Sequence, residues 1–359
     1  MKIGILTHHY INNFGAFLQA YALQEALREL FPDDEVCIVN FVNVKHFVIN
    51  TGGWFRFYIN RETASTWFAK IHLPITFQKA RKSYLNLSKV CFTAKEIETL
   101  GLDFIVVGSD EVWNFREGKG NSKVKFGIGL DKEVLVAYAP SVGQTDQTDL
   151  PDYVRTGIKK FRAVSARDDL TEQLAQTIRG EKIHRVLDPT FLVKIPDEPI
   201  HAITRPFILF YYCDGLPEKE KRMILEFARE HGMDVYGGGE CDKAYTKETV
   251  NLRPFQWVWL FRNAQYVVTG TFHGVVFSIL NHRRFACYLT NPSRVRKVTS
   301  LLQELGLEDR KCGPCGKEII EKLQEEIDYS AVEEKLNERR AESKAFLMQS
   351  MAAQTPELV

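Results

Sequence analysis

The sequence lacks several features that would assign it to a specialised class of protein. No apolar run approaches the roughly 18 residues that a membrane-spanning helix needs. The formal net charge is only +1, which gives no general electrostatic attraction to nucleic acid. The opening residues, Met1–Thr7, read as a first strand and are too short and wrongly flanked for a signal peptide. We therefore expect a cytoplasmic protein with no nucleic-acid partner.

Cysteine is sparse and scattered. The seven cysteines are an odd number, which is typical of free thiols in a reducing compartment. One close pair, in Cys312-Gly313-Pro314-Cys315, has the spacing of a redox or zinc motif. It lies late in the chain between two helical stretches, and a single C-x-x-C supplies only half the ligands of a structural zinc site. We expect neither redox chemistry nor a metal site there.

What the sequence does contain is two sets of alternating strand and helix patterns. A chain of 359 residues is too long for one simple core, and short β-branched segments alternate with amphipathic stretches. The first set predicts strands at Lys2–Leu6, Glu35–Asn40, Phe104–Val107, Val134–Tyr138, Ala163–Ser165 and Arg185–Leu187, with helices at Phe14–Leu30 and Leu170–Arg179. The second predicts strands at Phe207–Tyr212, Asp234–Tyr236, Tyr266–Val268 and Phe285–Leu289, with helices at Glu218–His231, Phe255–Asn263, His273–Asn281 and Arg296–Leu305.

These patterns predict an α/β protein with two Rossmann-like doubly wound domains that face a cleft. The predicted N-terminal domain is 1–195 and the C-terminal domain is 206–328, with a proline-containing linker between them. Residues 329–359 are predicted to form a C-terminal helix and tail.

Residues 45–90 interrupt the first domain with a basic and aromatic insertion. Eight lysines and arginines stand against one acid, Glu62, with aromatic residues such as Trp54, Phe57 and Trp67 between them. This composition suits contact with a membrane surface or an anionic glycan. The alternative is a helical excursion whose aromatic side chains pack on the sheet while its lysines are solvated.

The turn at 269–274 is the strongest candidate for chemistry. It follows a predicted strand and opens a helix, where unpaired N–H groups favour an anion. His273 at the helix start could exchange a proton near neutral pH, and glycine would let a ligand approach the backbone. The alternative is a histidine that only caps the helix. We expect Gly270, Thr271, Phe272, His273 and Gly274 to contact the ligand.

Two arginines extend this candidate site. Arg167 follows one strand and Arg294 another, and a guanidinium at such a position can hold a carboxylate or phosphate with two hydrogen bonds. For Arg167 the alternative is an ion pair with Asp168 or Asp169. For Arg294 the alternative is a solvated position in a surface loop.

Two further loops carry polar groups that suit a sugar. The loop before the first helix contains Asn12, Asn13 and Gly15, which could also serve as a plain helix cap. The segment 108–114 offers Ser109 and Asp110 for hydroxyl groups and Trp113 as a flat face for a sugar ring. Alternatively, Asp110 caps a helix and Trp113 packs in the core. The segment has no G-x-G-x-x-G and no phosphate-loop lysine.

Taken together, these segments resemble the polysaccharide pyruvyl transferase family. The matching stretches, in order, are Gly4–Thr7 with Asn13–Gln24, Val107–Asn114, Leu187–Thr190, Val267–Ile279 and Leu305–Arg310. The resemblance implies a two-domain fold like that of the GT-B glycosyltransferases. It also implies transfer of the carboxyvinyl unit of phosphoenolpyruvate to a sugar diol of a cell-surface glycan or its precursor, giving a pyruvate ketal and phosphate.

The resemblance also implies roles for residues. His273 is the family's catalytic histidine by position, and Arg167 and Arg294 would hold phosphoenolpyruvate, a co-substrate used without any other cofactor. Asn12, Asn13, Gly15, Ser109, Asp110 and Trp113 would lie on the side of the saccharide or lipid-linked acceptor. The sequence departs from the family at Thr271, where many members carry an arginine. That change removes one cation from the expected donor site.

Two other functions stay open on the sequence. One is a GT-B-type glycosyltransferase with a nucleotide-sugar donor, and the other is a non-catalytic glycan-binding protein. The location expected for the enzyme is the cytoplasm, with a peripheral contact at the inner face of the membrane through 45–90. The sequence makes no prediction of the oligomeric state.

Overall fold

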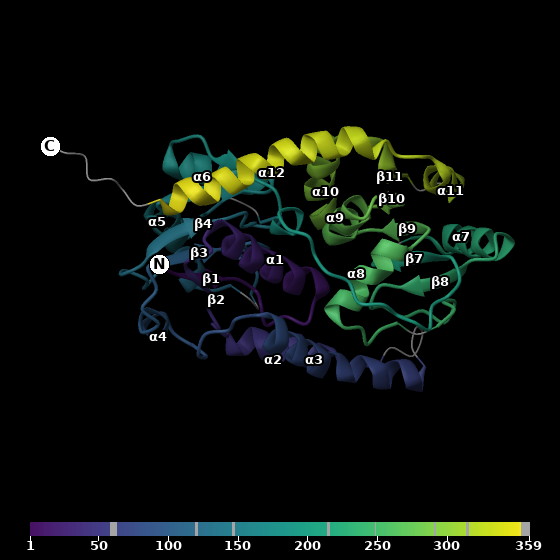
Figure 1. Cartoon of the computed structure of the whole chain (residues 1–359), viewed down its shortest axis with the longest axis horizontal. Coiled ribbons are helices and arrows are strands. Elements are labelled where there is room, and N and C mark those ends of the chain that lie inside the picture. The colour runs from purple at the N-terminus through teal and green to yellow at the C-terminus, as the bar shows by residue number, and fades with distance from the viewer. Residues whose placement is uncertain are drawn as a thin grey trace. The chain divides into compact units, whose positions relative to one another are not determined.

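The computed structural model describes residues 1–57, 63–118, 121–145, 148–213, 216–247, 249–290, 292–313 and 316–352. The chain divides into two compact units. Unit 1 comprises Met1–Ile49, Arg81–Val193 and the chain from Asn337 onward, and unit 2 comprises Asn50–Ala80 and Lys194–Leu336 (Figure 1). These units differ from the predicted domains in how they group residues 50–80 and the C-terminal helix. Pro314, Cys315 and the tail from residue 353 lie outside the described residues.

Unit 1 is built on a six-stranded sheet with the order β2-β1-β3-β4-β5-β6. Every pairing in it is parallel. The strands are β1 (Lys2–Leu6), β2 (Glu35–Ile38), β3 (Phe104–Val107), β4 (Val134–Ala137), β5 (Ala163–Ala166) and β6 (His184–Arg185). The helical elements that begin in unit 1 are α1 (Phe14–Leu30), α2 (Val44–Gly53), α4 (Ala94–Glu98), η1 (Lys123–Phe126), α5 (Asp152–Lys160), α6 (Asp169–Arg179) and η2 (Pro189–Phe191).

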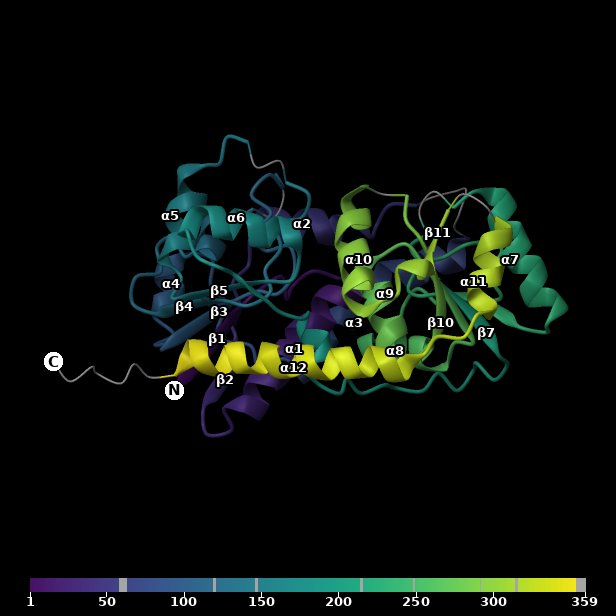
Figure 2. The same ribbon diagram turned by 90° about the horizontal axis from the view of Figure 1, so that it is seen from above.

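Helices cover both faces of this sheet. Figure 2 shows α1 and the C-terminal part of α12 (Tyr329–Met351) on one face, and α5 and α6 on the other. Most residues of α1 are buried because its leucines and alanines recur at helical spacing. The side chain of Phe346 in α12 packs near Tyr138, which follows β4.

Unit 2 repeats the plan with a five-stranded sheet, again wholly parallel in its pairings, with the order β11-β10-β9-β7-β8. The strands are β7 (Phe207–Tyr211), β8 (Asp234–Gly237), β9 (Tyr266–Thr269), β10 (Arg284–Tyr288) and β11 (Lys311–Cys312). Its helical elements are α3 (Ala64–Tyr84), α7 (Glu218–Glu230), α8 (Pro254–Asn263), α9 (Phe272–Leu280), α10 (Pro292–Leu305), η3 (Glu308–Arg310) and α11 (Gly316–Gln324), of which α3 ends in unit 1. Helices α7 and α11 lie on one face and α8 and α9 on the other (Figure 2).

The two sheets confirm the predicted class of two doubly wound α/β units. In each, the strand order reverses once: between β1 and β3 in unit 1, and between β7 and β9 in unit 2. In open parallel sheets, ligands bind beyond the carboxyl ends of the strands at such a reversal. Most of the predicted site residues follow β1 and β3 in unit 1 and β9 in unit 2, whereas Arg167 follows β5 and Arg294 follows β10. That the two sheets face a shared cleft stays a prediction.

Candidate functional site

In unit 1, two buried polar side chains join the two loops at the strand-order reversal. The Thr7 hydroxyl, just after β1, donates to the backbone carbonyl of Ser109 over 3.1 Å. Gln19 of α1 donates through Nε2 to the Thr7 Oγ1 at 2.9 Å and accepts from the Ser109 N–H at 3.1 Å. The loop after β3 is therefore fixed against β1 and α1, and the position of Asp110 follows from that.

Arg167 lies at the same edge of the sheet and is almost fully buried, with 3% of its side chain exposed. Its Nη1 donates to Asp188 Oδ2 at 2.5 Å and to Ser109 Oγ at 3.2 Å, and its Nη2 donates to Asp110 Oδ1 at 3.2 Å. Burial lowers the pKa of Arg167, but the attraction of Asp188 and Asp110 outweighs this and raises it overall.

These contacts bear on the ion-pair alternative for Arg167, which named Asp168 or Asp169 as its partner. The carboxylates found against Arg167 are Asp188 and Asp110, whereas Asp168 caps α6 by accepting from the Thr171 N–H at 2.9 Å. Contact between Arg167 and a donor molecule stays a prediction. In the present arrangement, two carboxylates already balance its charge, so its direct effect is to position Asp110.

The three residues predicted from the 108–114 segment have different environments. Ser109 is fully buried. Trp113 is fully buried as well: it stacks on Phe126 at 5.7 Å, and its Nε1 donates to the carbonyl of Lys125 at 2.9 Å. The prediction that Trp113 stacks on a sugar ring is wrong for this structure, because the indole belongs to the core. Asp110 keeps 20% of its side chain exposed and is the accessible member of the three.

The loop before α1 shows a similar division. Asn13 caps α1, since its Oδ1 accepts from the Ala16 N–H at 3.1 Å, and it is exposed. Asn12 is buried and accepts through Oδ1 from Arg81 Nη1 at 3.2 Å. Gly15 is buried in the first turn of the helix. The capping alternative therefore describes Asn13, and Asn13 is also the residue of this loop that a ligand could reach.

A buried lysine at this edge was missed by the sequence analysis. Lys125 in η1 is fully buried, and its Nζ lies 2.9 Å from His8 Nδ1. His8 packs edge-on against His46, whose Nδ1 lies 3.0 Å from the Tyr10 hydroxyl. Lys125 forms no ion pair within the part of the chain that the structure describes. Its apolar neighbours Val124 and Phe126 gave no signal that distinguished this lysine from the exposed Lys123.

Burial lowers the pKa of Lys125 from the usual 10.5 to about 7, although Glu117 and Asp110 act to raise it. The pKa of His8 is also lowered, first by its own burial and then by Lys125. Lys125 and His8 therefore form a pair that can gain or lose one proton near neutral pH. The negative charge of Asp110 raises the pKa of both groups.

Replacing Lys125 with methionine is expected to stabilise unit 1 near neutral pH. Below pH 7 the wild-type lysine is charged in both states, so folding carries the whole penalty of burying the ammonium. As the pH rises from about 7 to 10.5, only the unfolded chain keeps the proton, and the penalty declines by about 1.4 kcal/mol per pH unit. Denaturant unfolding at several pH values should show the gain of Lys125→Met shrinking toward high pH. The exposed Lys123→Met is the control, and a gain independent of pH would contradict the assignment.

In unit 2, the turn after β9 forms the start of α9. Thr271 caps the helix, because its Oγ1 accepts from the Gly274 N–H at 3.0 Å. His273 is the second residue of α9 and is half-buried, whereas the Phe272 side chain is buried. Thr271 stands where many members of the family carry an arginine, and its hydroxyl group caps the helix. Phe272 was predicted to contact the donor, but its side chain packs in the core and only its backbone lies at the helix start.

The two glycines of this turn are required by protein packing. A Cβ on Gly270 would lie 2.7 Å from the Tyr212 carbonyl oxygen and 2.8 Å from that of Tyr288. A Cβ on Gly274 would lie 2.0 Å from the Thr269 Oγ1. From the sequence we expected these glycines to let a ligand approach the backbone. In the structure, the atoms that leave no room for a Cβ belong to the neighbouring strands and to the loop after β7.

Arg294 meets this turn through the loop after β7. Its Nη1 lies 3.4 Å from the Tyr212 carbonyl oxygen, the same atom that Gly270 packs against. The Gly270 N–H and the Thr269 hydroxyl both donate to the carbonyl of Tyr211, at 3.3 Å and 3.0 Å. The predicted donor residues of unit 2 are therefore connected around the β7–β9 reversal, and Arg294 is half-buried there rather than fully solvated.

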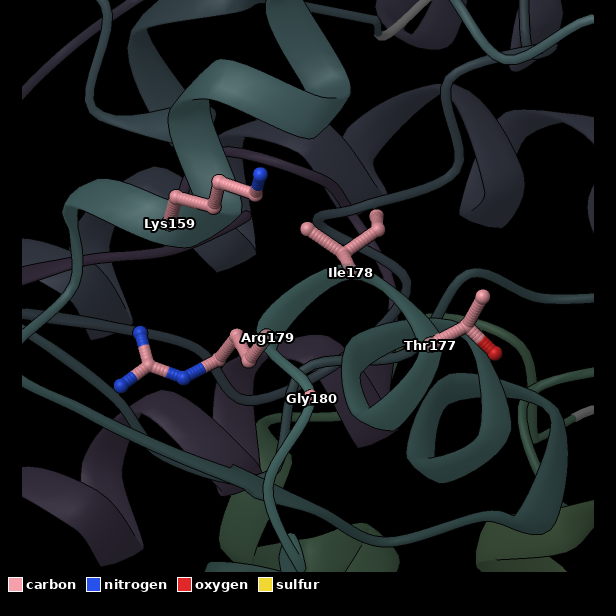
Figure 3. A pocket seen from close by; sticks show the side chains of 5 residues that line it. All are labelled: Lys159, Thr177, Ile178, Arg179 and Gly180. Carbon is pink, nitrogen blue, oxygen red and sulfur yellow. The ribbon is translucent and has the colours of Figure 1, made fainter.

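A surface hollow of unit 1 lies elsewhere. It has a volume of about 340 Å³ and is lined by Lys159, Thr177, Ile178, Arg179 and Gly180 (Figure 3). These residues come from the last turns of α5 and α6 and the glycine that ends α6, which precede strands β5 and β6. The hollow is therefore near the amino ends of the strands, and none of the predicted site residues lines it.

Comparison with known proteins gives a family match. A family model described as polysaccharide pyruvyl transferase matches residues 13–292, which include every residue predicted for the site except Asn12 and Arg294. No curated protein matches the sequence.

Solved structures resemble the chain in fold. UDP-GlcNAc 2-epimerase from Neisseria meningitidis, bound to UDP-GlcNAc, has a TM-score of 0.52 at 10% identity, covering 98% of this chain and 99% of that one. UDP-GlcNAc 2-epimerase from Methanocaldococcus jannaschii has a TM-score of 0.49 at 12% identity, covering 91% of this chain and 93% of that one. The first likeness agrees with the predicted GT-B-like fold class and, at this identity, concerns the fold alone.

Proposed function

The chain belongs to the polysaccharide pyruvyl transferase family, and from that premise we propose that it transfers a carboxyvinyl group from phosphoenolpyruvate to a sugar diol. The acceptor would be a saccharide or lipid-linked glycan, and the products a pyruvate ketal and phosphate. We further propose a cytoplasmic location with a peripheral contact at the membrane through residues 45–90. No cofactor beyond the co-substrate enters this proposal.

One observation carries the proposal beyond the family match. Polar and basic residues gather at the strand-order reversal of both sheets: Asp110 and Asn13 in unit 1, and His273 and Arg294 in unit 2. A bisubstrate transfer needs one site for each substrate, and this fold class places binding sites at these reversals.

The residues of unit 2 suit the donor. The positive end of the helix dipole at the start of α9 and the guanidinium of Arg294 favour the carboxylate and phosphate of phosphoenolpyruvate. His273 is the proposed general acid, which protonates the vinyl carbon as the first sugar hydroxyl adds to the adjacent carbon. Phosphate then leaves from that carbon, and the second hydroxyl adds in its place to complete the ketal.

The residues of unit 1 suit the acceptor. Each hydroxyl that attacks loses a proton, and a partly exposed carboxylate held by a buried arginine can accept it. Asp110 is the proposed base for this reason. Lys125 and His8 act on it electrostatically from the interior, and their lowered pKa values keep the site from gaining a fixed excess of positive charge near pH 7.

Ligand-induced stabilisation and phosphate release test the donor. Phosphoenolpyruvate is expected to raise the melting temperature, because a ligand that binds only the folded state stabilises it. Uridine and guanosine diphosphates are the comparison, since a larger shift with either would favour the nucleotide-sugar alternative. With a panel of lipid-linked and synthetic glycans, phosphate should be released from phosphoenolpyruvate only when the right acceptor is present. Glycan binding without phosphate release, unchanged in His273→Ala, would favour the non-catalytic alternative.

A further inference from the structure

The described residues expose large apolar side chains mainly in one part of the chain. More than half of the strongly exposed large hydrophobic residues lie between Val44 and Ile75. Isolated exposed apolar residues are ordinary, whereas a concentrated group marks a surface that another molecule covers.

Helix α2 supplies the first part of this group. His46 is its one buried residue, and Val44, Phe47, Val48 and Ile49 are all strongly exposed. An amphipathic helix of a globular protein normally turns its apolar side inward. In α2 the apolar side chains instead face outward.

Helix α3 supplies the second part and has two distinct faces. Leu73 and Phe77 are fully buried, and Thr76 next to them is held by a 2.7 Å hydrogen bond to Asn251. The opposite face follows the same helical spacing and is exposed along its length, through Phe68, His72, Ile75, Lys79 and Lys82. This exposed face combines apolar and cationic side chains.

Residues 54–57, which follow α2, are fixed with Phe55 and Phe57 exposed. Trp67 of α3 donates through Nε1 to the carbonyl of Phe55 at 3.2 Å, and Lys70 donates to the carbonyl of Arg56. The rings of Phe57 and Trp67 meet edge-on at 6.3 Å. Phe55, Phe57 and Phe68 nevertheless remain at least half exposed. Hydrogen bonds to α3 therefore hold the backbone of residues 55 and 56, next to the exposed rings of Phe55 and Phe57.

The charge of this surface has one sign. Residues 45–89 contain eight lysines and arginines and a single acid, Glu62, which lies outside the described residues. Five of the basic side chains are exposed, and none of these five forms an ion pair within the described part of the chain: Lys45, Arg56, Lys79, Lys82 and Lys89.

We propose that the surface formed by residues 54–57 and the exposed face of α3 docks on a lipid bilayer that contains anionic lipids. Phenylalanine and aliphatic side chains enter the boundary between headgroups and acyl chains, while lysine and arginine pair with the headgroup phosphates. No helix in the described residues is long and apolar enough to cross a membrane, so the surface lies on the bilayer.

The charge also argues against a second copy of the chain as the covering partner. A two-fold interface would place this surface against itself. The same basic side chains would then face one another with no acidic side chain from the described part of residues 45–89 between them, which is unfavourable. A bilayer with anionic lipids can cover the exposed apolar side chains and also balance the charge of the basic ones.

Binding to the membrane would bring the enzyme to lipid-linked acceptors, and this consequence rests on the proposed function. The docking itself does not, because it can be measured without any substrate. A protein that floats with vesicles but releases no phosphate would retain the docking inference and reject the proposed function, and the converse result would do the opposite.

The test is flotation of the full-length protein with vesicles. Vesicles of phosphatidylcholine with phosphatidylglycerol should carry the protein, pure phosphatidylcholine vesicles should carry much less, and added salt should weaken the binding. Phe55→Ser/Phe57→Ser/Phe68→Ser should lower the partition coefficient at least about tenfold, because three aromatic groups no longer enter the bilayer. Lys79→Gln/Lys82→Gln should remove much of the preference for the anionic vesicles.

The matched control is Phe92→Ser, because Phe92 is 53% exposed, close to the 55% of Phe68, but lies beyond α3. It should float like the wild type, and all variants should keep the wild-type melting temperature. Equal flotation of the triple variant and the Phe92→Ser control would overturn the inference. The inference would also be overturned if size-exclusion chromatography showed a dimer for the wild type and a monomer for the triple variant, since that result assigns the surface to self-association.

Discussion

His273→Ala is expected to lower the rate of phosphate release by about 10²–10⁴-fold while the protein stays folded. The histidine is the proposed acid for the vinyl carbon, and no other side chain of the α9 start carries an exchangeable proton near neutral pH. The fold should be unaffected because the cap of α9 is formed by Thr271 and Gly274, which the substitution leaves in place. The measurement is the turnover number with phosphoenolpyruvate and a productive acceptor, together with the melting temperature.

The control for this prediction is His201→Ala. His201 is an exposed histidine of the same unit and lies far along the chain from the turn after β9. Its loss should change neither turnover nor stability. The pH dependence gives a second readout, because one ionisation of the wild-type profile should disappear in His273→Ala. Near-normal turnover in that variant would remove His273 from the mechanism.

Arg167→Met is expected to destabilise the protein by about 3–5 kcal/mol, because it leaves two carboxylates at the carboxyl edge of the sheet without their cation. Asp188 is fully buried at its side chain, and Asp110 is 20% exposed, so the larger cost falls on Asp188. Adding Asp188→Asn should recover part of the loss, since the amide is neutral and can still accept the hydrogen bond from Thr190. Denaturant unfolding at neutral pH measures both changes.

An exposed ion pair provides the comparison. Arg205 lies 3.1 Å from Asp234 and is 60% exposed, so Arg205→Met should cost less than about 1 kcal/mol. If Arg167→Met cost no more than this control, the network would not be what positions Asp110. Turnover of the folded fraction should fall as well, because Asp110 loses the donor that orients it.

The sequence predicted the secondary structure well where apolar periodicity is strong. Lys2–Leu6, Phe14–Leu30 and Phe104–Val107 are found with the predicted bounds. Helices α4, α5 and α11 were not predicted, and the predicted strand at Arg185–Leu187 is the two-residue β6, His184–Arg185. Helices α4, α5 and α11 have only five to nine residues and β6 has two, so each gives a periodic pattern few positions in which to repeat.

The candidate site was predicted less completely. The spacing of Gly270 and His273 after a strand correctly indicated a helix start, and the capping alternative for Asn13 is observed. Trp113 was assigned to a ligand although it lies in the core, and Lys125 was not singled out at all. A tryptophan or lysine looks the same in sequence whether it is buried or exposed, because burial depends on neighbours that are distant along the chain.

The sequence by itself determined that there are two parallel sheets, in which order strands and helices follow along the chain, and to which family the chain belongs. It could do so because strand and helix periodicity and short motifs are local properties. Only the tertiary structure decided which charges meet. Asp110, Arg167 and Asp188 follow β3, β5 and β6, and they come together because the carboxyl ends of parallel strands share one edge of the sheet. The partner of a buried charge is set by strand order, which no segment of the sequence contains on its own.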